Sequence, residues 1–64
     1  MKYKYYQRKL LGRDTLYRTY YNKRSHRSVL QFWFKELNKW YKDKEYDLNG
    51  MKEISEEEAF AILL

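Results

Sequence analysis

Few residues of this 64-residue chain belong to the types that carry out catalysis, and their spacing does not suit it. The single histidine, His26, follows Ser25 in a run of basic residues. A nucleophile and its base must point at each other within hydrogen-bond reach, and a third group must orient the base. Neighbouring residues of an exposed loop rarely do so, and no aspartate follows closely. We therefore expect His26 to be a solvated loop residue or a phosphate contact.

Carboxylates are the second set of residues that could do chemistry. Glu56 to Glu58 are consecutive, whereas metal ligands on a helix are three or four residues apart. The run 47–50, Asp-Leu-Asn-Gly, is similar to the opening of a calcium loop but lacks the third ligand required before the glycine, so an Asn-Gly turn explains it better. There is no cysteine and no glycine-rich loop. The sequence predicts a protein that is not an enzyme and holds no metal or cofactor.

Positive charge and tyrosine rings gather in the first half of the chain. Residues 1–32 hold nine lysines and arginines against one aspartate, a net charge of +8, whereas residues 33–64 hold five cations and eight carboxylates, a net charge of −3. Such a division favours a polyanionic partner for the basic half, or attraction between the two halves. An acidic protein surface is the other partner that this charge suits.

The basic half predicts a nucleic-acid surface if the first two strands present their cations on one face. Rings between the cations would stack on bases while the cations neutralise phosphates. The candidate contacts are Lys4, Arg8, Arg18, Lys23, Arg24 and Arg27. Against this hypothesis, tyrosines also serve as cross-strand partners and basic residues keep sheet edges soluble. Leu10 and Leu16 would also fall on the supposed binding face.

Two strands and a turn are expected to position these residues. Residues 2–11 and 15–22 are rich in tyrosine, and Gly12-Arg13-Asp14 between them has the composition of a hairpin turn. The basic run 23–27 then has the length of a second hairpin loop.

The run Val29–Phe34 is the most apolar in the chain and decides the architecture. As a strand it places Leu30, Phe32 and Phe34 on one face. A helix over 28–42 is the alternative, because the apolar residues also follow a 3.6-residue repeat, but it would put Phe32 among lysines. Strand is the working interpretation.

The second half of the chain is expected to complete the sheet and cover it. Residues 35–39 have the composition of a turn and 40–42 that of a short strand, while Asn49-Gly50 is the strongest two-residue turn signal. Whether 46–48 and 51–54 pair around it stays open. Ser55 and Glu58 form a capping box at the start of an amphipathic helix. The expected core, between this helix and the sheet, is Leu30, Phe32, Phe34, Phe60 and Leu63.

The stretch from Trp33 to Leu64 resembles the C-terminal half of many short uncharacterised bacterial and phage proteins. The shared features are a tryptophan, a turn, Lys39-Trp40, a charged stretch and the string Glu-Ile-Ser-Glu-Glu-Glu-Ala at 53–59. The resemblance implies a β-meander closed by a helix and a bacterial or mobile-element origin; it implies no activity.

The sequence thus predicts one small α+β domain over residues 1–64, a three- or four-stranded antiparallel meander with a C-terminal helix. With no signal peptide and no apolar run long enough to span a bilayer, we expect a cytoplasmic protein without a membrane partner. Its expected function is non-catalytic binding, to nucleic acid through the basic residues named above. The competing hypothesis is a protein-interaction or regulatory accessory protein that binds through an aromatic patch at Trp33 and Trp40. A homodimer is a third expectation, since so thin a core gains stability by association.

Overall fold

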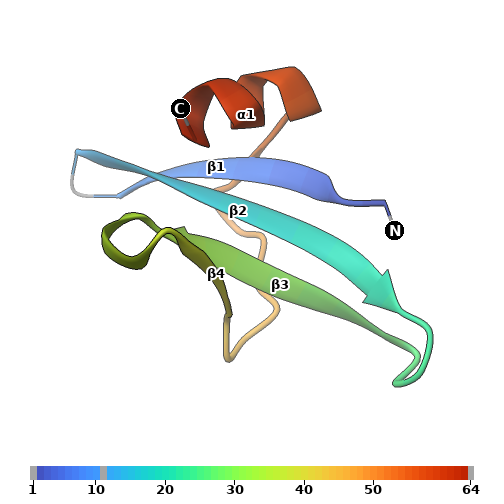
Figure 1. Cartoon of the computed structure of the whole chain (residues 1–64). Helices are drawn as coiled ribbons and strands as arrows, with labels where there is room; N and C mark the ends of the chain where they lie inside the picture. Colours follow the sequence, from blue (N-terminus) through green and yellow to red (C-terminus); the bar gives the residue numbers. More distant parts are fainter. Residues whose placement is uncertain (1, 11, 64) are drawn as a thin grey trace.

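The computed structural model describes residues 2–10 and 12–63 and has the predicted α+β class, with five strands and one α-helix (Figure 1). In chain order the elements are β1 (Lys4–Leu10), β2 (Arg13–Asn22), β3 (Arg27–Phe34), the 3-10 helix η1 (Lys35–Leu37), β4 (Lys39–Lys42), β5 (Lys52–Ile54) and α1 (Glu56–Leu63). No helix in the described part of the chain is long and apolar enough to cross a membrane.

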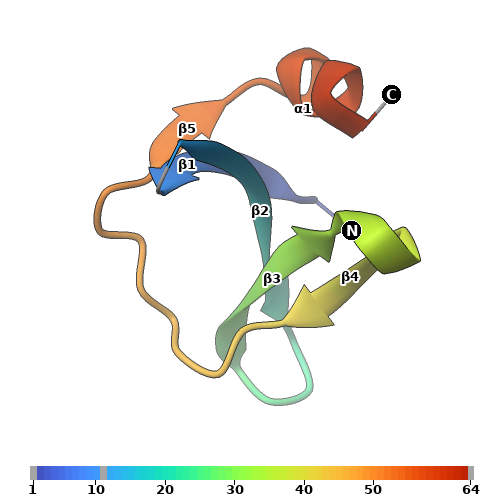
Figure 2. The ribbon, with the colours of Figure 1, turned by 90° about the vertical axis from the view of Figure 1, so that its left-hand side faces the viewer.

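The strands form a single antiparallel sheet in the order β4-β3-β2-β1-β5. The first four make a meander, and the chain then crosses from the β4 edge to the opposite edge, where β5 pairs with β1. Figure 2 shows that the sheet is strongly curved and that the β4–β5 connection swings around it. The fifth strand is one more than the sequence predicted. Residues 46–48 are not a strand, so Met51–Ile54 does not pair with them. Its residues 52–54 form β5, which pairs with the free edge of β1.

The first hairpin is tighter than the expected three-residue connection. Arg13 pairs with Leu10, so Arg13 and Asp14 belong to β2 and not to the turn, in which Gly12 lies. Gly12 takes φ of +78°, a left-handed conformation that glycine adopts without steric cost. The predicted end of the first strand at residue 11 lies outside the described residues.

The strand interpretation of Val29–Phe34 is confirmed, and the alternative helix over 28–42 is wrong. Within this span β3 pairs with β2 and β4 on its two sides, and η1 is the sole helical turn. Asn38 ends that turn at φ of +50° and lets the chain reverse into β4. The strand predicted at 40–42 is present, with Lys39 added to it.

The predicted helix start is confirmed in atomic detail. The Glu58 N–H donates to Ser55 Oγ at 3.1 Å, and the Ser55 N–H donates back to Glu58 Oε1 at 3.3 Å. These reciprocal bonds satisfy backbone donors that the first turn would leave unpaired. The helix packs over β1, and its Ala59 is completely buried.

The predicted core is wrong about which sheet face the helix covers. The buried cluster under α1 is Tyr5, Leu16, Ile54 and Ala59, with the half-buried Tyr3, Trp33, Trp40 and Leu63 packed against it. Leu30, Phe32 and Phe34 alternate with Trp33 along β3 and so lie on the opposite face. Phe34 is 38% exposed and Phe60 47% exposed, so neither is a core residue. Both faces of β3 carry apolar residues, and for this reason alternation alone could not choose between them.

The face opposite the helix is covered by the connection between β4 and β5. Leu30, Tyr17 and Thr19 are buried there although no helix lies on that side. Leu48 and Met51 close a turn through the Met51 N–H bond to the Leu48 carbonyl at 3.1 Å, with Gly50 at φ of +75°. The predicted Asn49-Gly50 turn is therefore confirmed, although it shapes a covering loop and not a hairpin.

Candidate nucleic-acid interface

The cations predicted to form one surface lie on both faces of the sheet. Lys4 pairs with Thr19 and Tyr5 pairs with Arg18, so Arg18 shares a face with Tyr5 while Lys4 and Arg8 share the other. The condition for a single positive sheet face, that the charged faces of the two strands coincide, is therefore not met. The register that decides this follows from the pairing of Leu10 with Arg13, which leaves a shorter connection than the three residues that the sequence predicted.

Arg18 holds the concave, helix-side face together. Its guanidinium carbon lies 4.1 Å from the ring centroids of both Tyr3 and Trp40, between two aromatic side chains. Its Nε–H donates to Gln31 Oε1 at 2.6 Å. Planar guanidinium groups stack on rings in this way, and partial burial strengthens the attraction. Arg18 thus joins the residue that precedes β1 to β4 across the sheet, and this structural role occupies both faces of its guanidinium.

Arg8 is engaged on the opposite face. One terminal N–H group donates to the carbonyls of Asp47 at 3.3 Å and Asn49 at 2.9 Å, and the guanidinium lies 5.3 Å from the Tyr17 ring centroid. Its Nε is buried without a hydrogen-bond partner among the described residues. Arg8 therefore fastens the β4–β5 connection to the sheet.

The three remaining candidates, apart from Lys4, lie at the β2–β3 turn. The Asn22 side-chain oxygen accepts from the Arg24 N–H at 2.9 Å and the Ser25 N–H at 3.5 Å, which ties the turn to the end of β2. His26 follows with φ of +55°, a left-handed conformation that lets the chain enter β3. Lys23, Arg24 and Arg27 are all exposed at this end of the molecule. The turn therefore presents a fixed set of cations to solvent.

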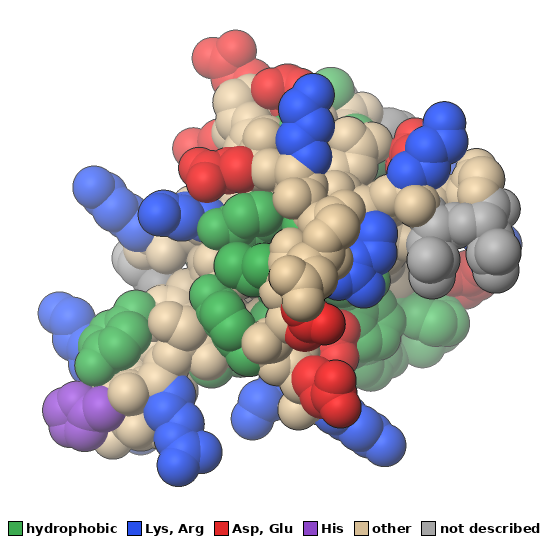
Figure 3. Space-filling model, turned by 180° about the vertical axis from the view of Figure 1, so that it is seen from behind, with side chains coloured by type: hydrophobic (Ala, Val, Ile, Leu, Met, Phe, Trp, Pro, Cys, Tyr) green, Lys and Arg blue, Asp and Glu red, His purple; other side chains and the backbone are tan. Residues whose placement is uncertain are grey.

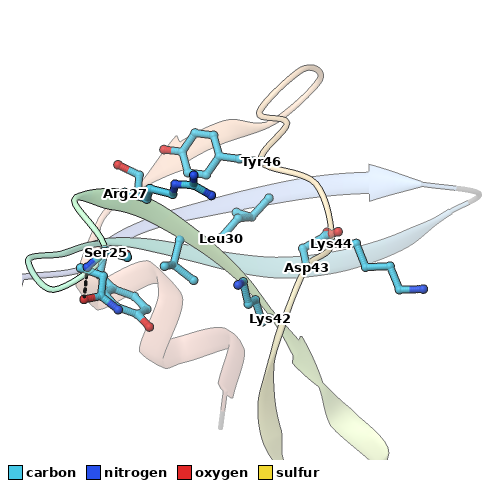
Figure 4. Close-up of a pocket in the computed structure, with 11 residues that line it drawn as sticks. Ser25, Arg27, Leu30, Lys42, Asp43, Lys44 and Tyr46 are labelled. Atoms are coloured by element: carbon cyan, nitrogen blue, oxygen red, sulfur yellow. Dashed lines mark hydrogen bonds between the residues drawn. The ribbon is translucent and has the colours of Figure 1, made fainter.

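A hollow of about 630 Å³ lies beside this turn, between β3 and the start of the β4–β5 connection (Figure 4). We call it the basic groove; it is lined by Tyr20, Asn22, Ser25, Arg27, Ser28, Val29, Leu30, Lys42, Asp43, Lys44 and Tyr46. Three cations line it against one carboxylate, that of Asp43, whose Oδ1 accepts the Glu45 N–H at 3.3 Å. Its balance of charge is positive. Lys42 and Lys44 were not among the predicted contacts: Lys42 was placed in the short strand 40–42, and Lys44 lies in a charged stretch for which the sequence predicted no element.

The groove borders an open stretch of sheet edge. The ladder between β3 and β4 covers Gln31–Phe34 and is extended by the Asp43 N–H bond to the Leu30 carbonyl at 2.8 Å. Residues 27–29 lie beyond that bond. Because backbone groups two residues apart on a strand point the same way, the N–H and C=O of Ser28 face the side on which β4 has ended. The groove thus combines cations with main-chain donors and acceptors.

Exposed tyrosines flank the groove. Tyr46, in its lining, is 51% exposed, and Tyr21, near the end of β2, is 54% exposed. Ring faces that stay in contact with water are available for stacking on a planar ligand. Cations, main-chain groups and rings therefore meet at one end of the molecule.

The aromatic patch predicted at Trp33 and Trp40 is not an exposed surface. The two rings pack edge to face at a centroid distance of 5.4 Å, and both side chains are half-buried against the core under α1. Tyr5 approaches Trp40 at 6.4 Å from the far side of the curved sheet. This pair stabilises the fold, and no partner can reach its full surface.

Carboxylates gather at two places on the surface. Figure 3 shows one group at the helix end of the molecule, at the top, and a second at the lower centre, while the histidine of the β2–β3 turn lies near basic side chains at the lower left. The three glutamates of the first turn of α1 are exposed at the helix end, where the helix dipole favours negative charge. The β2–β3 turn, with Lys23, Arg24 and Arg27 exposed, is therefore a basic part of the surface away from these glutamates.

No family model matches the chain, and comparisons with curated proteins and with solved structures find no match. Within residues 2–10 and 12–63, no group of three or more histidines and carboxylates could hold a metal ion.

Proposed function

We propose that this protein is a small non-catalytic binding module that takes single-stranded nucleic acid into the basic groove. The observation that carries the proposal is that Arg27, Lys42 and Lys44 all line one hollow next to the exposed turn cations Lys23 and Arg24. Lysine and arginine side chains bind phosphates by releasing the counterions around the strand. Contacts of this kind give affinity with little dependence on sequence.

The shape of the groove favours a single strand over a duplex. Tyr46 in the lining and the open main-chain edge at Ser28 suit the faces and edges of unpaired bases. A duplex keeps its base faces stacked inside, so it would use the cations alone. Of the residues first predicted, Lys23, Arg24 and Arg27 belong to the proposed interface, whereas Arg8 and Arg18 hold the fold together and Lys4 lies on another strand.

A titration of labelled oligonucleotides at several salt concentrations tests the proposal. The logarithm of the affinity is expected to fall linearly with the logarithm of salt concentration, by about 0.7 for each phosphate contacted on a single strand. Replacing Lys42 and Lys44 together by alanine should weaken binding and lower this slope by about 1.4. The matched control replaces Lys9 and Lys52, two exposed lysines outside the groove lining, by alanine. Its salt slope should differ from that of the parent protein by less than about 0.7, the value for one phosphate contact. Negligible binding at low salt would refute the proposal.

A second candidate function rests on the open edge of β3. An extended acidic peptide could pair with the backbone at Ser28 and place its carboxylates on Lys42 and Lys44. Such a peptide would compete with oligonucleotides for the groove. Titration with an oligoglutamate peptide separates the two, because tight peptide binding without oligonucleotide binding would assign the groove to a protein partner.

A further inference from the structure

Three aromatic side chains form an exposed platform on the sheet face away from α1. Phe32 and Tyr41 stack at a centroid distance of 6.0 Å with 26° between their planes, and Phe34 meets Tyr41 edge to face at 5.8 Å. We call these three residues the aromatic platform. Phe34 and Tyr41 are each 38% exposed, and Leu37 beside them in η1 is 56% exposed. Figure 3, which views the molecule from behind, shows hydrophobic side chains gathered at the lower right.

The exposure of the platform contrasts with the burial of the other rings at the same strand pair. Trp33 and Trp40, the neighbours of Phe34 and Tyr41 along β3 and β4, turn to the other face and pack on the core. The β4–β5 connection covers the sheet near Arg8 and Leu30, and it leaves the platform open. Packing of this chain therefore does not account for the exposed rings.

The charges around the platform suit a polyanion. Lys39 pairs with Phe34 across the two strands, so it lies on the platform face, and Lys35 follows Phe34 directly. Both lysines are exposed. The hollow that Phe32 and Phe34 line also holds Arg13, Asp14 and Glu36, so with Lys35 and Lys39 the cations exceed the carboxylates by one. Rings between lysines are the arrangement that single-stranded nucleic acid recognises.

The platform lies further along β3 than the basic groove, on the other side of the β4–β5 connection that covers Leu30, so a strand joining the two would pass over this connection. Phe32 follows Leu30 by two positions and shares its face. The distance from Ser28 to Phe34 is six residue steps, or about 20 Å at the rise of a strand. About six nucleotides fit this length at the stacked spacing of 3.4 Å per nucleotide.

We propose that a single strand leaving the basic groove crosses the aromatic platform, with its bases stacked on Tyr41 and Phe34 and its phosphates next to Lys39 and Lys35. This inference rests on the proposed function and extends it, since it assigns the strand's path, a length of about six nucleotides, and a base-stacking site separate from the phosphate-binding groove. A self-association surface is the other use that exposed rings would serve, and the test below decides between the two.

The test compares ring variants with oligonucleotides of two to twelve nucleotides. Affinity of the parent protein is expected to rise steeply up to about six nucleotides and only gradually beyond. Tyr41→Leu and Phe34→Leu keep apolar bulk and remove the aromatic face. Each should weaken hexanucleotide binding about 5- to 100-fold with the salt slope unchanged, because stacking releases no counterions. Phe60→Leu is the matched control, since Phe60 is 47% exposed on the helix.

Each result separates the inference from the proposed function. If the Lys42 and Lys44 variant loses binding while both ring variants bind as the parent does, the path over the platform is wrong and the groove stands. If no variant affects binding, both fail. If sedimentation velocity shows a dimer that Tyr41→Leu abolishes while oligonucleotide binding is unchanged, the platform is a self-association surface. Amide shifts of the parent protein on adding a hexanucleotide give a measurement that no variant can disturb: they should include Phe32, Phe34 and Tyr41.

Discussion

The two faces of the sheet are covered in different ways. On the concave face, side chains from all five strands and the helix pack together around Leu16 and Ala59, and Arg18 is stacked between the rings of Tyr3 and Trp40. On the other face, a connecting segment lies over Leu30 and Tyr17 and is fastened through main-chain carbonyls to Arg8. One cover is a packed core, and the other is a loop held by hydrogen bonds.

This difference teaches how so small a chain divides its surface between stability and binding. A chain of this length has little apolar surface to bury, and most of its stability must come from one well-packed side. The loop-covered side then keeps rings and cations exposed, and both proposed contact sites include it. The comparison can be tested by weakening each cover in turn.

Truncating a core leucine should have the largest effect. Leu16 and Leu30 are each 2% exposed, but on opposite faces. Leu16→Ala should lower the free energy of unfolding by about 3–5 kcal/mol, since the interlocked rings cannot close the cavity. Leu30→Ala should lower the free energy of unfolding by about 2 kcal/mol, because the loop above Leu30 can move inward and partly fill the cavity. Urea unfolding followed by tryptophan fluorescence measures both, and a larger loss for Leu30→Ala would reverse the proposed ranking of the faces.

Removing the charge of Arg18 should have the next largest effect. Arg18→Met keeps an unbranched apolar side chain between Tyr3 and Trp40 but loses two cation–π contacts and the bond to Gln31. We expect a loss of about 1–2 kcal/mol in the free energy of unfolding. Arg24→Met, at the exposed turn, is the control and should change stability by less than about 0.5 kcal/mol. Equal effects of the two would show that Arg18 does not join Tyr3 to Trp40.

The helix cap tests how much the concave face depends on α1. Ser55→Ala removes the hydroxyl that accepts the Glu58 N–H and should cost about 1 kcal/mol. Amide exchange should rise in the first turn of α1 and in β5, which precedes it. Ser25→Ala, in the β2–β3 turn, provides the comparison. Unchanged exchange at Glu58 would mean that the capping box contributes nothing to stability.

Weakening the hydrogen bonds between Arg8 and the β4–β5 connection should have the smallest effect on global stability. Arg8→Lys keeps the charge but cannot reproduce the geometry that reaches two carbonyls, and a loss of about 0.5–1 kcal/mol is expected. Amide exchange at Asn49 and Met51, whose N–H groups are bonded within the loop, should rise, while exchange around Leu16 stays as it was. A parallel rise at Leu16 would show that the two faces open together.

Local signals in the sequence predicted most elements of this fold. The capping box placed the helix, glycine and asparagine marked the turns, and β-branched and aromatic residues favoured a strand at Val29–Phe34. Each of these signals depends on a few neighbouring residues. These local preferences can be recognised in the sequence without knowledge of the rest of the structure.

The misassigned features all depend on residues far apart in the chain. The face that the helix covers, the pairing of β5 with β1 and the separation of Arg18 from Arg8 follow from the register of β1 and β2 and from curvature. A difference of one residue in the first turn moves every side chain to the other face. For the candidate site, the turn cations were predicted, but Lys42 and the aromatic platform are placed by the pairing of β4 with β3, and Lys44 by the bend after β4.

The pairing of β1 with β5 also affects the order in which the protein can fold during its synthesis. Tyr5 meets Ile54, which is synthesised 49 residues later, so the residues of β1 to β4 are made before β5 and α1, which complete the cover over Tyr5 and Leu16. Until residues 52–63 have been synthesised, the rings of the meander are the only side chains that can shield the concave face from water.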